Sequence, residues 1–214
     1  TTVVSINPSA KMIYGIYEGV PLNDGDLLAS TNTLPVIRKN LQLLTARMVE
    51  QDRKMIDGLI AQGAKDLIIV NNNAGNGETG LAALLKAGRV RKIICSFPRQ
   101  ADSHIFDGLY RSGKLELELV PQGNLAERIR AAGAGIGGFF TPTGYGTALA
   151  KGKETREIDG RMYVLEHPIH ADVALIKAER GDRWGNLTYR KTARNFSPVM
   201  AMAAKLTIAS VREI

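Results

Sequence analysis

Apolar and polar positions fall into alternating blocks between residues 66 and 132, and these blocks predict strands and helices in turn. A short apolar run, of the type buried on both faces of a sheet, predicts a strand over residues 66–70, and further strands are predicted over residues 90–96 and 115–120. Helical spacing predicts helices over residues 80–87, 104–112 and 124–132. The first two helices are followed by Gly88 and Gly113, and glycine is favoured just past a helix end. Because the connections are short, the order predicts a parallel sheet covered by helices, with its strand-to-helix loops on one edge.

The pattern changes after Thr147. Asp159-Gly160 separates the predicted strands 155–159 and 161–166, and this dipeptide is a strong signal for a tight hairpin. The remaining elements are strands over residues 172–178, 187–191 and 206–211 and a helix over residues 198–205. We therefore expect one α/β domain over residues 1–214, in which a mostly parallel sheet is covered by helices and has an antiparallel hairpin excursion.

The part of the chain before Gly63 has a different pattern. Asp24-Gly25-Asp26 predicts a turn before a short apolar stretch at residues 27–29. Thr33 as a cap and Pro35 in the first turn make a plausible helix start. Apolar positions at helical spacing continue from there, which predicts one long helix or two consecutive helices that end at Gly63.

Composition places the chain among ordinary globular proteins. Its 214 residues are 44% hydrophobic and 23% charged. The apolar runs of the predicted strands are too short to cross a membrane, and the first residues lack the pattern of a secretion signal, so we expect a cytoplasmic protein. The single cysteine, Cys95, lies in an apolar segment, and a buried apolar role is favoured over a nucleophile.

The net charge of +7 indicates either a solvated basic surface or an anionic partner. Nucleic acid is one candidate, but the basic residues are spread along the chain among acidic ones. There is no run of five basic residues and no ladder of aromatic residues that would stack on bases. A phosphorylated small molecule or an acidic substrate fits at least as well, and we expect no nucleic-acid partner and no membrane partner.

Two polar loops are the best candidates for a binding site. Residues 71–77, with Asn71, Asn72 and Asn73, follow the first predicted strand of the alternating block, and Pro121-Gln122-Gly123 follows the third. Ligands of open α/β sheets bind at the carboxyl ends of strands, so the two loops would meet around one ligand. Neutral amides there would hold a carboxylate or an oxyanion. A purely structural role, in which these residues make turns, has equal weight on spacing alone.

The other motifs give weaker signals. The glycine clusters at residues 133–138 and 144–146 would cradle a phosphate or allow close backbone packing, and packing is favoured because neither the P-loop nor the dinucleotide fingerprint is matched. His167 and His170 have no partners that complete a metal site, so we expect no metal. His104 is expected at the surface, and Trp184 in packing or at an interface.

Residues 64–214 resemble the A (α) subunit of the family I CoA-transferases. The motifs that carry the resemblance occur in the order found in that family: NNAG at residues 72–75, VPQGNLAERIRAAGAG, TPTGYGT, GKETREIDGRMYVLE, ADVALIKA, GDRWGNLTYRK and ARNF. The segments CSFPRQAD and GDRWGNLTYRKTARNF are most similar to those of family members that act on 3-oxoadipate.

The resemblance implies an enzyme that moves CoA from succinyl-CoA to a 3-oxo acid by a ping-pong route through a glutamyl-CoA thioester. The nucleophilic glutamate is expected on a partner B subunit, in a heterodimer or an α2β2 tetramer, so no catalytic residue is expected on this chain. The CoA thioester is a substrate, and no permanently bound cofactor is implied. The resemblance assigns substrate binding to Asn72, Asn73, Gln122 and Gly123.

The resemblance does not extend to residues 1–54, which contain nothing like the glycine-rich GGFG-type segment that the family's A subunit carries before the helix ending in MIDGLIAQGAKDL. This atypical part and the basic charge leave an alternative open. The alternative is a non-catalytic domain on the same fold that binds a ligand or regulates another protein.

Overall fold

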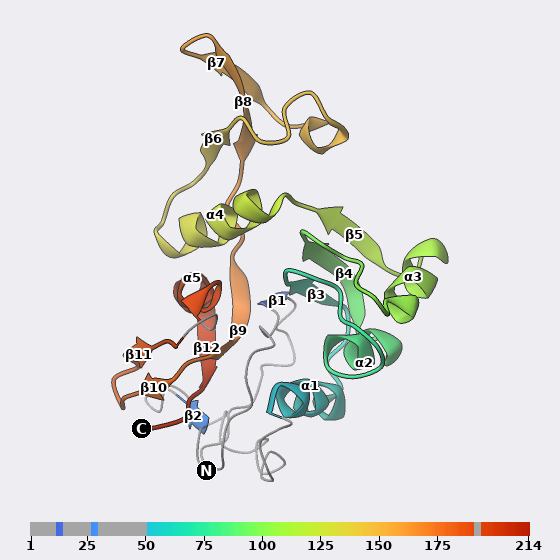
Figure 1. Ribbon diagram of the computed structural model, residues 1–214, viewed down its shortest axis with the longest axis vertical. Coiled ribbons are helices and arrows are strands. Elements are labelled where there is room, and N and C mark those ends of the chain that lie inside the picture. Colours follow the sequence, from blue (N-terminus) through green and yellow to red (C-terminus); the bar gives the residue numbers. More distant parts are fainter. Residues whose placement is uncertain (1–11, 15–26, 30–50, 191–193) are drawn as a thin grey trace.

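The computed structural model describes residues 12–14, 27–29, 51–190 and 194–214, and its centre is a sheet of seven strands (Figure 1). The strand order is β2-β12-β9-β1-β3-β4-β5, and every neighbouring pair is parallel except β12 with β2. This agrees with the predicted mostly parallel sheet. The strands are β1 (Met12–Tyr14), β2 (Leu27–Ala29), β3 (Leu67–Val70), β4 (Val90–Cys95), β5 (Glu116–Leu119), β9 (Ala171–Lys177) and β12 (Ala204–Ser210).

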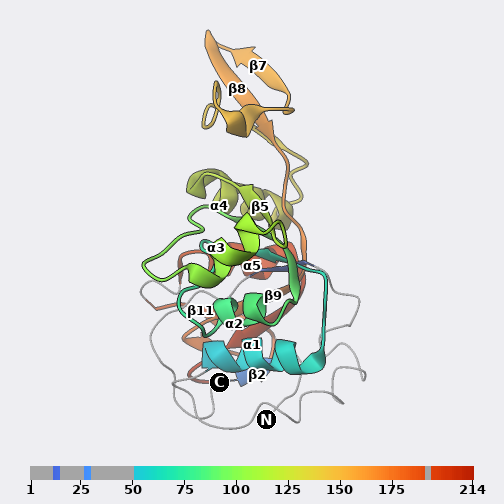
Figure 2. The same cartoon turned by 90° about the vertical axis from the view of Figure 1, so that its right-hand side faces the viewer.

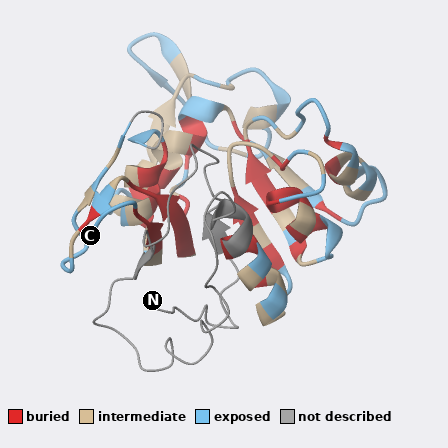
Figure 3. Cartoon of the chain, turned by 60° about the horizontal axis from the view of Figure 1, so that its bottom comes forward, coloured by how far each residue is buried: buried red, intermediate tan, exposed pale blue. Residues whose placement is uncertain are grey.

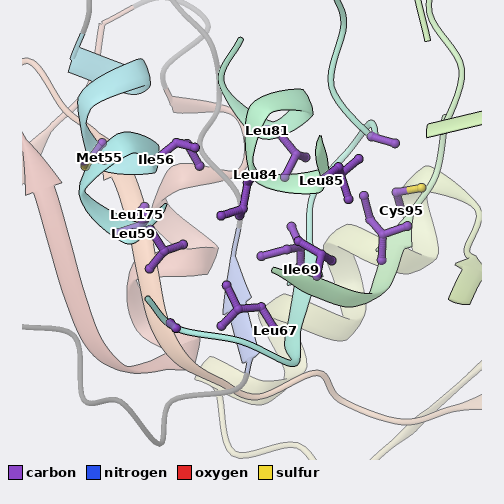
Figure 4. Close-up of a cluster of buried hydrophobic side chains, with 14 of the residues drawn as sticks. Met55, Ile56, Leu59, Leu67, Ile69, Leu81, Leu84, Leu85, Cys95 and Leu175 are labelled. Atoms are coloured by element: carbon purple, nitrogen blue, oxygen red, sulfur yellow. The ribbon is translucent and has the colours of Figure 1, made fainter. Parts of the chain in front are cut away.

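Helices cover both faces of this sheet. One buried cluster joins α1 (Gln51–Gln62), α2 (Leu81–Lys86) and α3 (His104–Arg111) to the strands (Figure 4). A second cluster lies under α4 (Gln122–Gly133) and α5 (Ser197–Ala203). Successive strand residues alternate between the two clusters: Ile69 and Ile93 belong to the first, Val70 and Ile94 to the second. Strand β3 is apolar throughout because both of its faces are buried, and Figure 3 shows the buried strands between the helices.

Most predicted elements are confirmed within one or two residues of their ends, but α4 corrects one of them. The helix predicted over residues 124–132 begins at Gln122, because Pro121 takes an extended conformation as the N-cap and its carbonyl accepts the Leu125 N–H at 2.8 Å. Gln122 and Gly123 therefore lie in the first turn of a helix and not in a loop. The helix start predicted at Thr33 and Pro35 lies outside the described residues. Of the N-terminal part before Gly63, the structure describes β1, β2 and α1.

An antiparallel arm, residues 139–166, projects from the body of the molecule (Figures 1 and 2). It contains β6 (Phe139–Thr141), β7 (Thr155–Ile158), β8 (Arg161–Glu166) and the short helix η2 (Ala148–Ala150), with strand order β6-β8-β7. The predicted hairpin is confirmed: Asp159 and Gly160 have φ of 50° and 74°, which is the left-handed pair of a type I′ turn. After β9 in the chain, β10 (Arg180–Gly181) and β11 (Leu187–Thr188) form a small antiparallel ribbon.

A charged network joins this arm to the large sheet through α4. Arg128 donates to a carboxylate oxygen of Glu118 at 2.9 Å and to the carbonyl of His167 at 2.7 Å, and its Nε lies 3.7 Å from buried Glu166. Burial would raise the pKa of Glu118, but hydrogen bonds from Lys92 and Arg128 outweigh that effect and hold the pKa below its ordinary value. The network therefore keeps Glu118 charged between two cations.

No helix in the described part of the chain is both long and apolar enough to cross a membrane.

The glycines at and beyond the end of α4 include two that allow close packing, as predicted. A Cβ at Gly133 would lie 2.7 Å from Cβ of Met202 on α5, and one at Gly138 would lie 3.3 Å from the Glu166 carbonyl oxygen. Gly137 has nothing within 4 Å of the same position. The cluster is therefore not uniform, since α4 can approach α5 only because residue 133 has no side chain.

We expect Gly133→Ala to lower the free energy of unfolding by about 1–3 kcal/mol, because the added methyl overlaps Met202 and forces α4 and α5 apart. The measurement is urea denaturation followed by circular dichroism. Gly137→Ala is the matched control, and its effect should stay within about 0.5 kcal/mol. Equal stability of the two variants would contradict the close contact of α4 with α5.

Candidate functional site

Three consecutive strand ends meet at one edge of the sheet, where β3, β4 and β5 pass into the loops that follow them. The Asn71 N–H donates to the Ile94 carbonyl at 3.0 Å, and the Phe97 N–H donates to the Asn72 carbonyl at 2.9 Å. The Val120 N–H donates to the Cys95 carbonyl at 2.9 Å. These backbone bonds continue the ladder just past the strands, so the first residue of each loop is held in register with its neighbours.

The side chain of Asn72 is the meeting point of these three ends. Its Oδ1 accepts hydrogen bonds from Nε2 of Gln122 at 2.8 Å and from Oγ of Ser96 at 2.5 Å. The prediction that the two amide loops converge is therefore confirmed for Asn72 and Gln122. Ser96 was not predicted as a site residue, and its place as the last residue of the middle predicted strand is the signal that could have found it.

This arrangement fixes which way the Asn72 amide faces. Because both donors bind its oxygen, its NH2 group lies on the opposite side of the amide, and no described residue accepts a hydrogen bond from it. Gln122 itself is exposed. The N–H groups of these two amides are neutral hydrogen-bond donors that match a carboxylate or the oxyanion of an acyl intermediate.

Asn73 has a different role in the structure. Its Oδ1 accepts the Gly75 N–H at 2.9 Å, which is an Asx-type turn, and its carbonyl accepts Nδ2 of Asn71 at 3.1 Å. Gly75 has φ of +85°, and a Cβ there would lie 2.6 Å from the Ala82 nitrogen. The Asn73 side chain therefore shapes the loop that carries Asn72, and the structure does not bring it against Gln122.

Gly123 lies in the first turn of α4, next to Gln122. It is exposed, and a Cβ at this position would meet nothing within 4 Å. The helix start has no side-chain cap, so its backbone N–H groups and the positive end of the helix dipole face the site. Packing gives no reason for a glycine here, whereas the close approach of a ligand would give one.

A small hollow lies beside the amides, between the sheet and helices α4 and α5. Asn71 and Asn72 line one side of it, and the other side is apolar, formed by Val70, Leu125, Ile129, Phe196 and Met200. The polar donors of the site therefore border a hydrophobic wall.

The Ser96 hydroxyl donates to Asn72 and is hydrogen-bonded to no described base, and the other candidate nucleophile, Cys95, is also unsuited to attack. Cys95 is fully buried, and burial raises the pKa of its thiol to about 12, which confirms the predicted apolar role. Among the described residues, no carboxylate is hydrogen-bonded to Asn72 or Gln122, and no three His, Cys, Asp or Glu side chains gather as metal ligands. The described part of the site can bind and polarise a substrate, but it supplies no attacking group.

His104 and Trp184 both lie at the surface, as predicted for His104. The hydrogen bond that the His104 ring donates to the Asp102 carboxylate raises the pKa of His104. Trp184 is 70% exposed, and the Arg183 guanidinium lies 4.4 Å from its ring centroid. Neither residue contacts Asn72 or Gln122.

Comparisons with known proteins point to one family. The sequence profile of the family described as coenzyme A transferase matches residues 49–214. The A subunit of a 3-oxoadipate CoA-transferase from Pseudomonas putida is 76% identical over 161 residues, which are 75% of this chain and 70% of that protein. The protein of the same name from Acinetobacter baylyi is 68% identical over 164 residues, covering 77% of this chain and 72% of that protein.

Solved structures share the fold at much lower identity. The structure of a variant of the decarboxylase AibA/AibB matches with a TM-score of 0.65 and 22% identity, covering 95% of this chain and 69% of that one. Glutaconate coenzyme A-transferase from Acidaminococcus fermentans matches with a TM-score of 0.64 and 19% identity, covering 80% of this chain and 60% of that one. At these identities the likeness bears on the fold alone.

We expect the Cys95 thiol in the folded protein to react with iodoacetamide at pH 8 roughly a thousandfold more slowly than a free thiol, because so little of it is thiolate. Mass spectrometry of the labelled chain gives a clear readout, since there is one cysteine. The chain unfolded in guanidinium is the control and should label at the ordinary rate. Equal rates in the two states would contradict the burial of Cys95.

Proposed function

Because this chain belongs to the coenzyme A transferase family, we propose that it is the A subunit of a two-subunit enzyme that moves CoA from succinyl-CoA to a 3-oxo acid, with 3-oxoadipate as the preferred acceptor. The single observation that carries the proposal is the oriented amide of Asn72, which holds out hydrogen-bond donors where strands β3, β4 and β5 end. The names of the two Pseudomonas and Acinetobacter relatives support the choice of acid.

The proposed contribution of this chain is binding and polarisation. The Asn72 NH2 group, Gln122 and the first N–H groups of α4 donate to the carboxylate of the acid and to the thioester carbonyl oxygen. Negative charge grows on that oxygen when a nucleophile attacks, so donors fixed before the reaction stabilise the transition state more than the ground state. Asn73 holds the loop in shape beside them, and Gly123 leaves room for the ligand.

The proposed nucleophile belongs to a second chain. The thioester carbonyl carbon is attacked by a glutamate of the B subunit, and CoA leaves as the thiolate. The thiolate then attacks the glutamyl carbonyl, which releases succinate and leaves CoA on the glutamate as a thioester. The acceptor acid enters next and takes the CoA by the reverse of these steps. The absence of a usable nucleophile around Asn72 in the described residues supports this division of labour.

The alternative, a non-catalytic domain on the same fold, is less well supported. The relatives that match at 76% and 68% identity are named as transferase subunits. No observation on the described residues favours a regulatory ligand over a CoA substrate. Two statements remain predictions: the protein works in the cytoplasm, and it holds no permanent cofactor.

The direct test is to co-express the chain with a B-type partner chain and to assay transfer of CoA from succinyl-CoA to 3-oxoadipate. We expect transfer that follows ping-pong kinetics. A well-folded complex that transfers CoA to no 3-oxo acid would contradict the proposal.

We expect Gln122→Ala in that complex to lower kcat by about a hundredfold or more, because one donor is lost and Asn72 loses one of the two bonds that orient it. The free energy of unfolding should fall by only about 0.5–1.5 kcal/mol, the ordinary contribution of one hydrogen bond. Steady-state kinetics and thermal unfolding of the same preparation measure the two effects.

Gln100→Ala is the matched control for Gln122→Ala. Gln100 is also an exposed glutamine in the region after a strand end, but only its backbone is hydrogen-bonded: its N–H donates to Ser103 Oγ at 2.6 Å, and its carbonyl accepts from Ser103 Oγ at 3.3 Å. Its loss should change neither kcat nor stability. Unchanged activity in Gln122→Ala would remove Gln122 from the proposed site.

A further inference from the structure

One face of the projecting arm carries aromatic, aliphatic and arginine side chains that the rest of the chain leaves uncovered. In the antiparallel register Tyr163 lies opposite Arg156, and Leu165 lies opposite Phe140. Directly opposed residues share a face, and alternate residues of one strand do so too. The arm face, as we define it, therefore consists of Phe140, Arg156, Ile158, Arg161, Tyr163 and Leu165.

The arginines of this face lie over its rings. The Arg156 guanidinium is 4.6 Å from the Phe140 ring centroid, and that of Arg161 is 6.0 Å from the Tyr163 ring centroid. Ile158 is exposed, and Phe140, Tyr163 and Leu165 are only partly buried. Phenylalanine, tyrosine and arginine are the residues enriched in the cores of protein–protein interfaces.

Near the base of the arm, the opposite face of β8 is covered by the chain itself. Val164 and Glu166 are buried there, at 1% and 3% exposure. Lys153 donates to a carboxylate oxygen of Glu166 at 2.7 Å, and Asn124 of α4 donates to the same oxygen at 3.3 Å. A three-stranded sheet needs a covered apolar face to be stable, and within the described residues the cover on this arm reaches only the base of one face.

The base of the arm is fixed close to the candidate site. Asn124, which holds Glu166, is two residues after Gln122 on the same helix, and its Nδ2 also donates to the Thr143 carbonyl at 3.4 Å. Arg128 of the same helix adds its contact to Glu166 and its bond to the His167 carbonyl. The arm is thus rigidly joined to the helix whose first turn forms part of the site.

We propose that the arm face is a docking surface for the partner B subunit, the chain that supplies the nucleophile. The proposal rests on the proposed function, because a chain that brings a carboxylate to Asn72 and Gln122 must cover the start of α4, from which the arm rises. The matching surface of the partner has apolar side chains against Ile158 and Tyr163, and carboxylate or carbonyl oxygens facing Arg156 and Arg161. The arm then extends the interface beyond the active site.

The test compares binding of a purified B-type partner by this chain and by its variants, using isothermal titration and sedimentation. Ile158→Asp places a charge in the face, and Tyr163→Ala removes its central ring, so we expect each to weaken the dissociation constant by about tenfold or more. Glu157→Ala is the matched control, since Glu157 is exposed on β7 but points to the opposite face. It should bind as tightly as the original chain.

Hydrogen exchange keeps the proposal testable where a variant fails to fold. In the unmodified complex the amides of β7 and β8 should exchange more slowly than in the free chain. Unchanged exchange in the arm, or unchanged binding by Ile158→Asp, would overturn the proposal. The proposal would also be overturned if Ile158→Asp abolished self-association of this chain, seen by sedimentation, and left binding of the B-type partner intact. A complex that forms through the arm but transfers no CoA would count against the proposed function and leave the docking surface standing.

Discussion

The hydrogen bonds that Gln122 and Ser96 donate to the amide oxygen of Asn72 are the interactions on which the site depends. Each of the three residues follows a different strand, so the contact exists only because β3, β4 and β5 are adjacent and parallel. A shift of one residue in either pairing would turn one of the side chains to the other face of the sheet. The apolar clusters on both faces hold that register, and in this way the core determines the direction in which a surface amide donates.

The strands and the convergence of two loops could be predicted because they follow from local pattern and general topology. Runs such as 67–70 are apolar throughout because both faces are buried, and parallel strands must end at the same edge. Other features depend on distances that no local pattern contains. The role of Ser96 follows from the position of Asn72, and Gly133 differs from Gly137 only because Met202 lies beside it.

Among the short elements that were missed, β1 and β6 show the effects of length and context. β1 has three residues and pairs with both β9 and β3, so its place at the centre of the sheet comes from tertiary pairing and not from its own apolar content. β6 is equally short and lies beside glycines, and it forms a strand because β8 supplies a partner. The early start of α4 has a local cause, since Pro121 caps the helix through its backbone alone.

The described site has donors without an attacking group, and the arm has one face covered at its base and an uncovered one. Both features are accounted for together if a second chain completes the active site and lies against the arm. The buried contacts of Arg128 and Asn124 with Glu166 would then set the geometry of the whole interface, because they fix the arm to the helix that begins at Gln122.

A crystal structure of the two-subunit complex with bound 3-oxoadipate tests the central claim most directly, because the claim concerns the direction of one amide. The account predicts an oxygen of the acid within about 2.7–3.2 Å of Nδ2 of Asn72, with Gln122 and Ser96 still bonded to Oδ1. A bound acid that leaves Asn72 without contact, or an Asn72 amide turned so that its oxygen faces the acid, would contradict it.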